Sequence, residues 1–222
     1  MNTKINTKRK RVKFASDNVT GACPEVLEAV IKANDGIVPP YGNDEISGVL
    51  QEKFSKIFEK DVIVYPTASG TASNALALSA ISPSFGNIYC HKFSHINVDE
   101  CGAPEFYTGG AKLVPLNGED GKITTEELKN SIGGFGIVHH TQPSIVSITQ
   151  ATETGEVYTL EQIKNISEIT HKHNLKMHMD GARFANALVS LDVSPAEMTW
   201  KSGIDILSFG ATKNGCMAAE AI

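Results

Sequence analysis

The chain has 222 residues, of which 41% are hydrophobic and 20% are charged, and its formal net charge is −5. This balance is typical of a globular protein, and a negative net charge gives no support for nucleic acid or an anionic membrane as the main partner. No apolar run approaches the ~18 residues that a membrane span needs. The four cysteines show no metal-ligand spacing, which favours reduced thiols in a cytoplasmic protein that binds no metal.

The N-terminal part is predicted to hold a tail, two helices and a strand. Residues 1–13 are rich in Lys and Arg and no apolar segment follows them, so we expect a flexible basic tail and not a secretory signal. A helix is predicted from Pro24, a second over 45–59, and a β-branched strand over 61–65. The apolar side chains that repeat along the first helix predict a buried stripe: Val26, Leu27, Val30 and Ile31.

A tight turn of small and hydroxyl residues follows the predicted strand and opens a helix. Ser69, Gly70 and Thr71 lie at that helix start, where free backbone N–H groups and the helix dipole favour a phosphate. The turn is neither a Walker A loop nor G-x-G-x-x-G, so those nucleotide-binding interpretations fail. Taken alone, it is equally well explained as a hydroxyl-rich helix cap with no ligand.

Strand and helix patterns alternate from residue 61 onward. Further strands are predicted over 87–90, 111–116, 145–148, 176–179 and 204–207, and further helices up to residue 101, around residue 128, and over 160–173 and 184–188. This alternation predicts a three-layer α/β fold, a mostly parallel sheet with helices on both faces. Polar residues follow several of the strands, at the edge where open α/β sheets bind ligands.

Two charged residues follow apolar strands at this edge. Asp180 comes after the strand over 176–179, and a carboxylate there needs a cationic or hydrogen-bonding partner. Lys213 follows the last predicted strand among small residues, which leaves space for its amine to react with an aldehyde. An amine, an anion and a phosphate cradle are what pyridoxal 5'-phosphate (PLP) requires of a protein. The combination favours PLP, although Lys213 alone is better explained as a solvated loop lysine.

The motifs that contain these residues resemble the low-specificity L-threonine aldolases, fold-type-I PLP enzymes of the β-eliminating lyase group. They are Ser69-Gly70-Thr71, His95, the run from His178 to Arg183, and the run from Ser208 to Gly215. The resemblance implies that Lys213 forms the Schiff base with the cofactor and that Asp180 pairs with the pyridine nitrogen. It also implies that the turn Ser69-Gly70-Thr71 holds the phosphate and that His95 stacks on the ring.

The resemblance further implies cleavage of L-threonine, L-allo-threonine or a related β-hydroxy-α-amino acid to glycine and an aldehyde. Ser16 and Arg183 match positions near the substrate carboxylate, and His139 matches the histidine near the substrate hydroxyl. His139 is the first choice of catalytic base, with His95 or a bound water as alternatives, since a neutral imidazole suits that task near pH 7. A purely structural role stays open for His95, His139 and Arg183.

Members of the resembled family continue into a smaller C-terminal domain, which supplies a further arginine. The resemblance therefore implies that residues 14–222 are a PLP-binding large domain, truncated shortly after Lys213, and that the protein forms a homodimer or homotetramer. Two alternatives remain open at this point. One is another PLP-dependent reaction, β-elimination or transamination, because cofactor residues do not fix the reaction. The other is a catalytically incomplete fragment.

Overall fold

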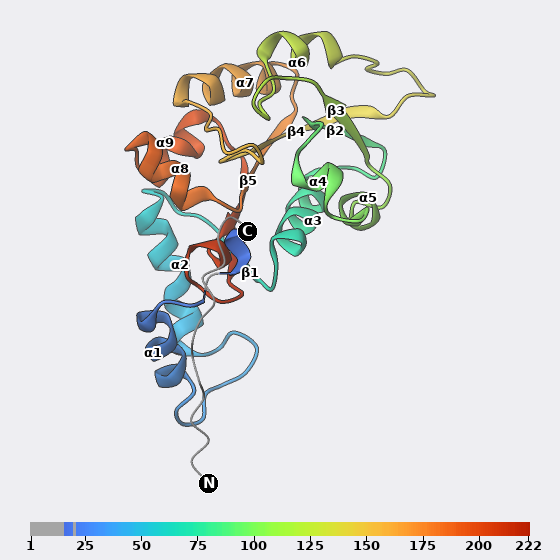
Figure 1. The fold of residues 1–222 in the computed structure, drawn as a ribbon. Coiled ribbons are helices and arrows are strands. Elements are labelled where there is room, and N and C mark those ends of the chain that lie inside the picture. The colour runs from blue at the N-terminus through green and yellow to red at the C-terminus, as the bar shows by residue number, and fades with distance from the viewer. Residues whose placement is uncertain (1–15, 20) are drawn as a thin grey trace.

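The structure, a computed structural model, describes residues 16–19 and 21–222, so the predicted tail over 1–13 lies outside the described residues. Among the described residues the centre is a seven-stranded sheet in the order β1-β7-β6-β5-β4-β2-β3 (Figure 1). The strands are β1 (Pro66–Thr67), β2 (Gly86–His91), β3 (Lys112–Leu116), β4 (Gln142–Thr149), β5 (Lys176–Gly181), β6 (Ile206–Gly210) and β7 (Glu220–Ala221). Strands β2 to β6 pair in parallel, and β7 pairs antiparallel with β6 and β1.

The helices of the described ranges lie between and beside these strands. They are α1 (Pro24–Ala33), α2 (Glu45–Ile57), α3 (Gly70–Ile81), α4 (His95–Val98), α5 (Ala103–Tyr107), α6 (Thr125–Ser131), α7 (Leu160–Lys172), α8 (Phe184–Leu191) and α9 (Pro195–Met198), with short 3-10 turns η1 (Asp17–Val19), η2 (Trp200–Ser202) and η3 (Thr212–Asn214). Side chains cap several of them. Thr159 and Gln162 form a capping box at the start of α7, which satisfies backbone donors that the helix leaves unpaired. None of the helices described is long and apolar enough to cross a membrane.

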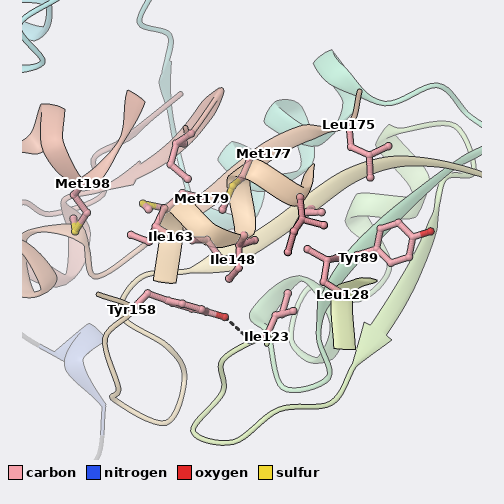
Figure 2. Close-up of a cluster of buried hydrophobic side chains, with 14 of the residues drawn as sticks. Tyr89, Ile123, Leu128, Ile148, Tyr158, Ile163, Leu175, Met177, Met179 and Met198 are labelled. Atoms are coloured by element: carbon pink, nitrogen blue, oxygen red, sulfur yellow. Dashed lines mark hydrogen bonds between the residues drawn. The ribbon is translucent and has the colours of Figure 1, made fainter. Parts of the chain in front are cut away.

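One face of the sheet carries the larger hydrophobic core (Figure 2). Val146 and Ile148 of β4 and Met177 and Met179 of β5 are buried there against α6, α7 and α8. The helices contribute, among others, Leu128, Ile163, Ile166 and Phe184. The backbone N–H of Ile123 donates to the hydroxyl of buried Tyr158 at 2.6 Å, so this polar oxygen has a hydrogen-bond partner where it enters the core.

The opposite face packs on α3. Successive side chains of a strand point to opposite faces, so Ile145 of β4 and Ile88 of β2 leave the larger core and pack with Leu78 of α3 in a second cluster. In Figure 1, α3 and α5 lie on one side of the strands and α6 and α7 on the other. The predicted three-layer, mostly parallel α/β fold is therefore confirmed.

The predicted strand over 61–65 is wrong. The only strand in that region is β1, two residues long and at the sheet edge beyond the equally short β7. The backbone N–H groups of Val62 and Val64 donate instead to side chains of α2, those of Ser55 at 3.2 Å and Gln51 at 3.1 Å. Tyr65 exchanges backbone hydrogen bonds with Ile222 at 2.9 and 3.0 Å, so pairing in this segment reaches only its last residue among those described.

The buried stripe predicted for α1 is also wrong. Leu27, Val30 and Ile31 are 45%, 51% and 73% exposed, and α1 buries no residue. In Figure 1, α1 lies away from the sheet. The 3.6-residue period correctly places these side chains on one face of a helix, but it does not say which surface covers that face.

Two boundaries also differ from prediction. The helix expected up to residue 101 is only α4, which ends at Val98. Cys101 and Gly102, with left-handed φ values of 52° and 76°, lie in the turn before α5. The last parallel strand, expected over 204–207, is β6, which runs to Gly210. Lys213 therefore lies in the turn η3 after that strand, close to the place that the sequence indicates.

Candidate active site

A cavity of about 270 Å³ lies at the carboxyl edge of the parallel strands. Its wall combines segments that are far apart in the sequence: the turn before α3, the start of α4, the end of β5, the turn η3 and the strand β7. The structure brings six of the predicted site residues together in this wall: Ser69, Gly70, Thr71, His95, Asp180 and Lys213. The carboxyl ends of parallel strands meet at one edge, which is why residues so distant in sequence converge.

The start of α3 forms one side of the cavity. Ser69 is its N-cap, with extended backbone, and its side-chain oxygen accepts a hydrogen bond from the N–H of Ala72 at 3.2 Å. The amides of the first turn lack partners within the helix, and they stand at the positive end of a 12-residue helix with no acidic residue in its first turn. This end of α3 therefore offers N–H donors and a positive potential to an anion.

Asp180 supplies a buried carboxylate opposite the start of α3. Only 3% of the residue is exposed. Its Oδ2 accepts from Nδ2 of Asn74 at 2.9 Å, and its Oδ1 accepts from the N–H of Ala182 at 3.0 Å. Both donors are neutral, and no salt bridge to Asp180 occurs within the described part of the chain. The carboxylate therefore retains capacity for a cationic N–H in the cavity.

Beneath Asp180, on the same face of the sheet, His178 spans three strands. Its Nδ1 lies 2.9 Å from Oγ of Ser147 on β4, and its Nε2 lies 2.9 Å from Oγ of Ser208 on β6. Complete burial lowers the pKa of His178 to about 4, against the opposing effect of Asp180, so the ring is neutral at pH 7. A neutral imidazole donates to one serine and accepts from the other, so both ring nitrogens are satisfied.

His95 opens α4 and borders the cavity. Its Nδ1 lies 2.8 Å from Oε1 of Glu100, whose side chain is fully buried, while the side chain of His95 is 31% exposed. The hydrogen bond to Glu100 raises the pKa of His95 above its usual value, although partial burial opposes this. The imidazole is thus held at one nitrogen and open to the cavity elsewhere.

Lys213 and Glu220 face the cavity from the last part of the chain. Lys213 is half-buried in η3, and the backbone turns back there because Gly215 adopts a left-handed φ of 84°. The N–H of Ala211 then donates to the carbonyl of Ala219 at 3.1 Å, which brings β7 against the turn. Burial raises the pKa of the Glu220 carboxyl, although hydrogen bonding from Thr212 opposes this.

Ser16 and Arg183 lie outside the cavity wall. Ser16 is exposed, and its Oγ accepts from the N–H of Asn18 at 3.2 Å. The guanidinium of Arg183 is held by two acids: its Nε donates to Asp17 at 2.6 Å, and its Nη1 lies 3.5 Å from Glu153. The pKa of Arg183 is raised because these carboxylates outweigh the effect of burial. Arg183 thus stands next to the cavity, since Ala182 lines it, but is engaged with carboxylates of its own chain.

His139 is not brought to the cavity within this chain. It is exposed in the turn that precedes β4, and so lies at the amino end of that strand. The cavity borders the carboxyl ends, at the other edge of the sheet. The cavity of this chain therefore gives no support to His139 as the base, and that role stays a prediction. His95 is the histidine that this cavity contains.

Four residues that line the cavity or hydrogen-bond to its lining were not predicted from the sequence: Asn18, Asn74, Glu100 and Glu220. Asn74 could have been recognised from the sequence, because it is a polar amide within the mostly small and apolar sequence of α3. Glu100 lies five residues after His95. This spacing matches neither the helix nor the strand period, so the sequence pattern does not predict a contact between them. The described residues contain no cluster of three or more His, Cys, Asp or Glu that could hold a metal ion.

Comparison with known proteins agrees with this geometry. A model of the beta-eliminating lyase family matches residues 13–222. Low specificity L-threonine aldolases from Pseudomonas sp. (strain NCIMB 10558) and Pseudomonas aeruginosa are 45% and 43% identical to the chain over 209 residues, which is 94% of this chain and 60% of each relative. The threonine aldolase of Leishmania major superposes with a TM-score of 0.86 at 28% identity, over 93% of this chain and 60% of that one.

The chain therefore spans about 60% of the length of these curated relatives. A putative L-allo-threonine aldolase from Listeria monocytogenes, 21% identical with a TM-score of 0.67, shares the fold. Because the family model covers nearly the whole sequence, the chain belongs to the beta-eliminating lyase family.

Proposed function

We propose that the cavity binds PLP and that the protein cleaves β-hydroxy-α-amino acids to glycine and an aldehyde. The observation that carries the proposal is the meeting of Lys213, Asp180 and the start of α3 in one cavity. The substrate class is supported by the two Pseudomonas relatives, which are named low specificity L-threonine aldolases. The resemblance of the chain's own motifs to that family points the same way.

The residues present fit the chemical needs of PLP. The ring nitrogen requires an anion, and Asp180 is buried with only neutral donors bonded to it. The phosphate requires N–H donors and a positive potential, which the start of α3 provides next to the hydroxyls of Ser69 and Thr71. The aldehyde requires an amine, and Lys213 lines the same cavity. The volume of about 270 Å³ is close to the lower end of the ~300–1,000 Å³ typical of ligand sites.

In this proposal each side chain has a separate task. When bound, PLP supplies an electron-poor ring that accepts the electron pair released as a Cα–Cβ bond breaks. Lys213 would supply the amine for the aldehyde carbon, whose oxygen would leave as water, and Asp180 would keep a proton on the ring nitrogen. Ser69, Gly70 and Thr71 hold the phosphate. His95 packs against the ring and, above its raised pKa, accepts the β-hydroxyl proton directly or through a water.

Substrate binding is proposed for Ser16 and Arg183 next to the cavity. A substrate carboxylate would have to replace Asp17 or Glu153 on the guanidinium of Arg183, which forms bidentate pairs with carboxylates well. We further propose a PLP-binding large domain over residues 14–222, a homodimer or homotetramer, and a cytoplasmic location. The exposed apolar side chains of α1 support association, and the four free cysteines support a reducing compartment.

The test uses the full chain incubated with PLP and L-threonine, with glycine and acetaldehyde measured as products. Borohydride reduction followed by peptide mass spectrometry is expected to place the cofactor on Lys213. The Lys213→Ala variant should lose that adduct and the cleavage, whereas Lys129→Ala, which removes an exposed lysine on α6, should lose neither. Pyruvate or ammonia as products would replace the aldolase assignment by β-elimination. An adduct without turnover would identify a catalytically incomplete fragment.

A further inference from the structure

A continuous row of hydrogen bonds joins His95 to Asp180 behind the cavity wall. Nδ1 of His95 lies 2.8 Å from Oε1 of Glu100, and the same oxygen accepts from Nδ2 of Asn74 at 2.8 Å. That amide nitrogen also donates to Oδ2 of Asp180 at 2.9 Å. The four residues come from α4, the turn between α4 and α5, α3 and β5. His95 and Asp180, on two sides of the cavity, are therefore linked through hydrogen bonds of Glu100 and Asn74.

The chemistry of these groups fixes where the hydrogens lie. Carboxylate oxygens only accept, so Asn74 must turn its NH₂ group toward Glu100 and Asp180, and both of its hydrogens are used. For the same reason Nδ1 of His95 must carry a hydrogen. Nε2 is then the ring nitrogen left for the cavity. The row defines one tautomer and one orientation of the imidazole.

Two atoms of the row are buried without a hydrogen-bond partner in the described structure, Oδ1 of Asn74 and Oε2 of Glu100. Leaving buried polar groups unpaired costs on the order of 1–3 kcal/mol each. Glu100 also brings a second acid close to Asp180, with one amide between them. An apolar pair of similar size would fill this space without these costs, so the row calls for a functional explanation.

We infer that Glu100 is the positioning residue of His95, and that Asn74 couples this pair to Asp180. The inference rests on the proposed function, because it assigns work to His95 in that site. Glu100 does not line the cavity and has a fully buried side chain, so it acts through the imidazole. It holds the ring by Nδ1 and presents Nε2 to the bound substrate, while Asn74 shares its two hydrogens between the acids.

The charges that face His95 come from several elements. Glu100 contributes most, through its hydrogen bond, and the charges of Glu100, Asp180 of β5 and Glu153 after β4 also raise the pKa of His95, whereas burial lowers it. Lys213 is the basic side chain in the same cavity wall. Below its raised pKa His95 donates a proton from Nε2, and above it the same nitrogen accepts one.

The test is an NMR titration of the histidine ring resonances of the full chain without PLP, with His95 assigned by its loss in His95→Asn. Glu100→Gln preserves the shape, because the amide oxygen can accept both hydrogen bonds and the NH₂ replaces the unpartnered Oε2. We expect the His95 titration midpoint to shift to lower pH in Glu100→Gln. Asp99→Asn removes the same charge one residue away at an exposed position, and should leave the midpoint in place.

A second variant tests the coupling through Asn74. Asn74→Ala leaves Glu100 with His95 as its only donor, so the midpoint should move to higher pH, opposite to Glu100→Gln. A variant that does not fold would show neither shift, and far-UV circular dichroism would identify it as unfolded. If Glu100→Gln does not fold, the direction of the midpoint shift in Asn74→Ala decides the question. An unchanged midpoint in folded Glu100→Gln, or a shift to lower pH in Asn74→Ala, overturns the inference.

The same variants separate this inference from the proposed function. With PLP and L-threonine, the pH profile of kcat should move to lower pH in Glu100→Gln, as the NMR midpoint does, and stay in place in Asp99→Asn. Absence of cleavage by the unsubstituted chain would reject the aldolase activity, while the titration would still decide whether Glu100 controls His95. Shifted NMR midpoints with an unmoved kcat profile in an active protein would reject the catalytic use of this control.

Discussion

The two faces of the central strands differ in what they bury. On the α7 face, Val146, Met177 and Met179 are fully buried in the larger hydrophobic core. On the α3 face, the same strands bury a polar set: Ser147, His178, Asp180 and Ser208. Alternate residues of β5 therefore contribute to the apolar core on one face and to a hydrogen-bonded polar set on the other. Substitutions on the two faces should have separable effects, which the following experiments test.

The largest effect is expected for Asp180→Asn on the polar face. A cationic ring nitrogen would lose the buried anion that pairs with it, which corresponds to about 4 kcal/mol or a roughly 1,000-fold weaker binding of PLP. An absorbance titration of PLP into each protein measures this. Asp192→Asn removes an exposed carboxylate at a left-handed position that asparagine tolerates, and should not change the affinity. Equal affinities for the Asp180 variant and the unsubstituted chain would show that Asp180 does not pair with PLP.

On the apolar face, Met177→Ala should cost about 3 kcal/mol of unfolding free energy, because it leaves a cavity among fully buried side chains. Urea unfolding followed by circular dichroism measures the cost. In the temperature range where the variant is folded, its affinity for PLP should remain within a few-fold of the parent. A loss of affinity as large as that of Asp180→Asn would mean that the two faces are not independent.

His178 should make stability depend on pH. In the unfolded chain its ring binds a proton below its ordinary pKa of 6.5, but in the folded chain burial delays this to about pH 4. Stability is therefore fully present above pH 6.5 and is lost as the pH falls, by on the order of 2 kcal/mol between pH 7 and pH 5. Urea unfolding at both pH values should show this loss, and His178→Gln should reduce it. The same loss in both proteins would contradict the assignment.

A smaller effect is expected for Ser208→Ala. Neutral His178 needs both serines to satisfy its two nitrogens, so removing one hydroxyl leaves a buried ring nitrogen unpaired at a cost of about 1 kcal/mol. Unfolding free energies of Ser208→Ala and of Ser190→Ala, an exposed change on α8, provide the comparison. An Ser208→Ala chain as stable as the Ser190→Ala chain would show that the three-strand contact contributes nothing.

Most of the fold could be predicted because periodicity and alternation depend on local sequence. The strands β2 to β6 and the helices α2, α3, α6 and α7 lie close to their predicted positions. The incorrect predictions concern segments whose structure depends on contacts with residues far away in the sequence. Residues 61–65 have strand propensity but no long neighbouring strand, and Leu27 and Ile31 of α1 have a common face without a covering surface.

The candidate site shows the same division. Lys213 and Asp180 could be placed at one edge because each follows a predicted strand of the parallel sheet. Ser69 reaches the same edge after the short antiparallel strand β1, and not after the strand predicted over 61–65. His139 is assigned from the resemblance alone, and its position before β4 puts it at the opposite edge from the cavity, so its role stays a prediction. Glu100 could not be predicted as a site residue because its position depends on the turn between the short helices α4 and α5. Sequence periodicity does not determine the geometry of such a turn.

The pairing of β7 with β1 has a consequence for the order of events during synthesis. Pro66 pairs with Ala221 and Thr67 with Glu220, so the strand that leads into α3 is held by nearly the last residues described. Every other strand must have emerged from the ribosome before this pair can form, and closing such a long loop is slow. A nascent chain can thus pack its apolar core first, and it closes the cavity only when residues 220–222 are free to enter the sheet.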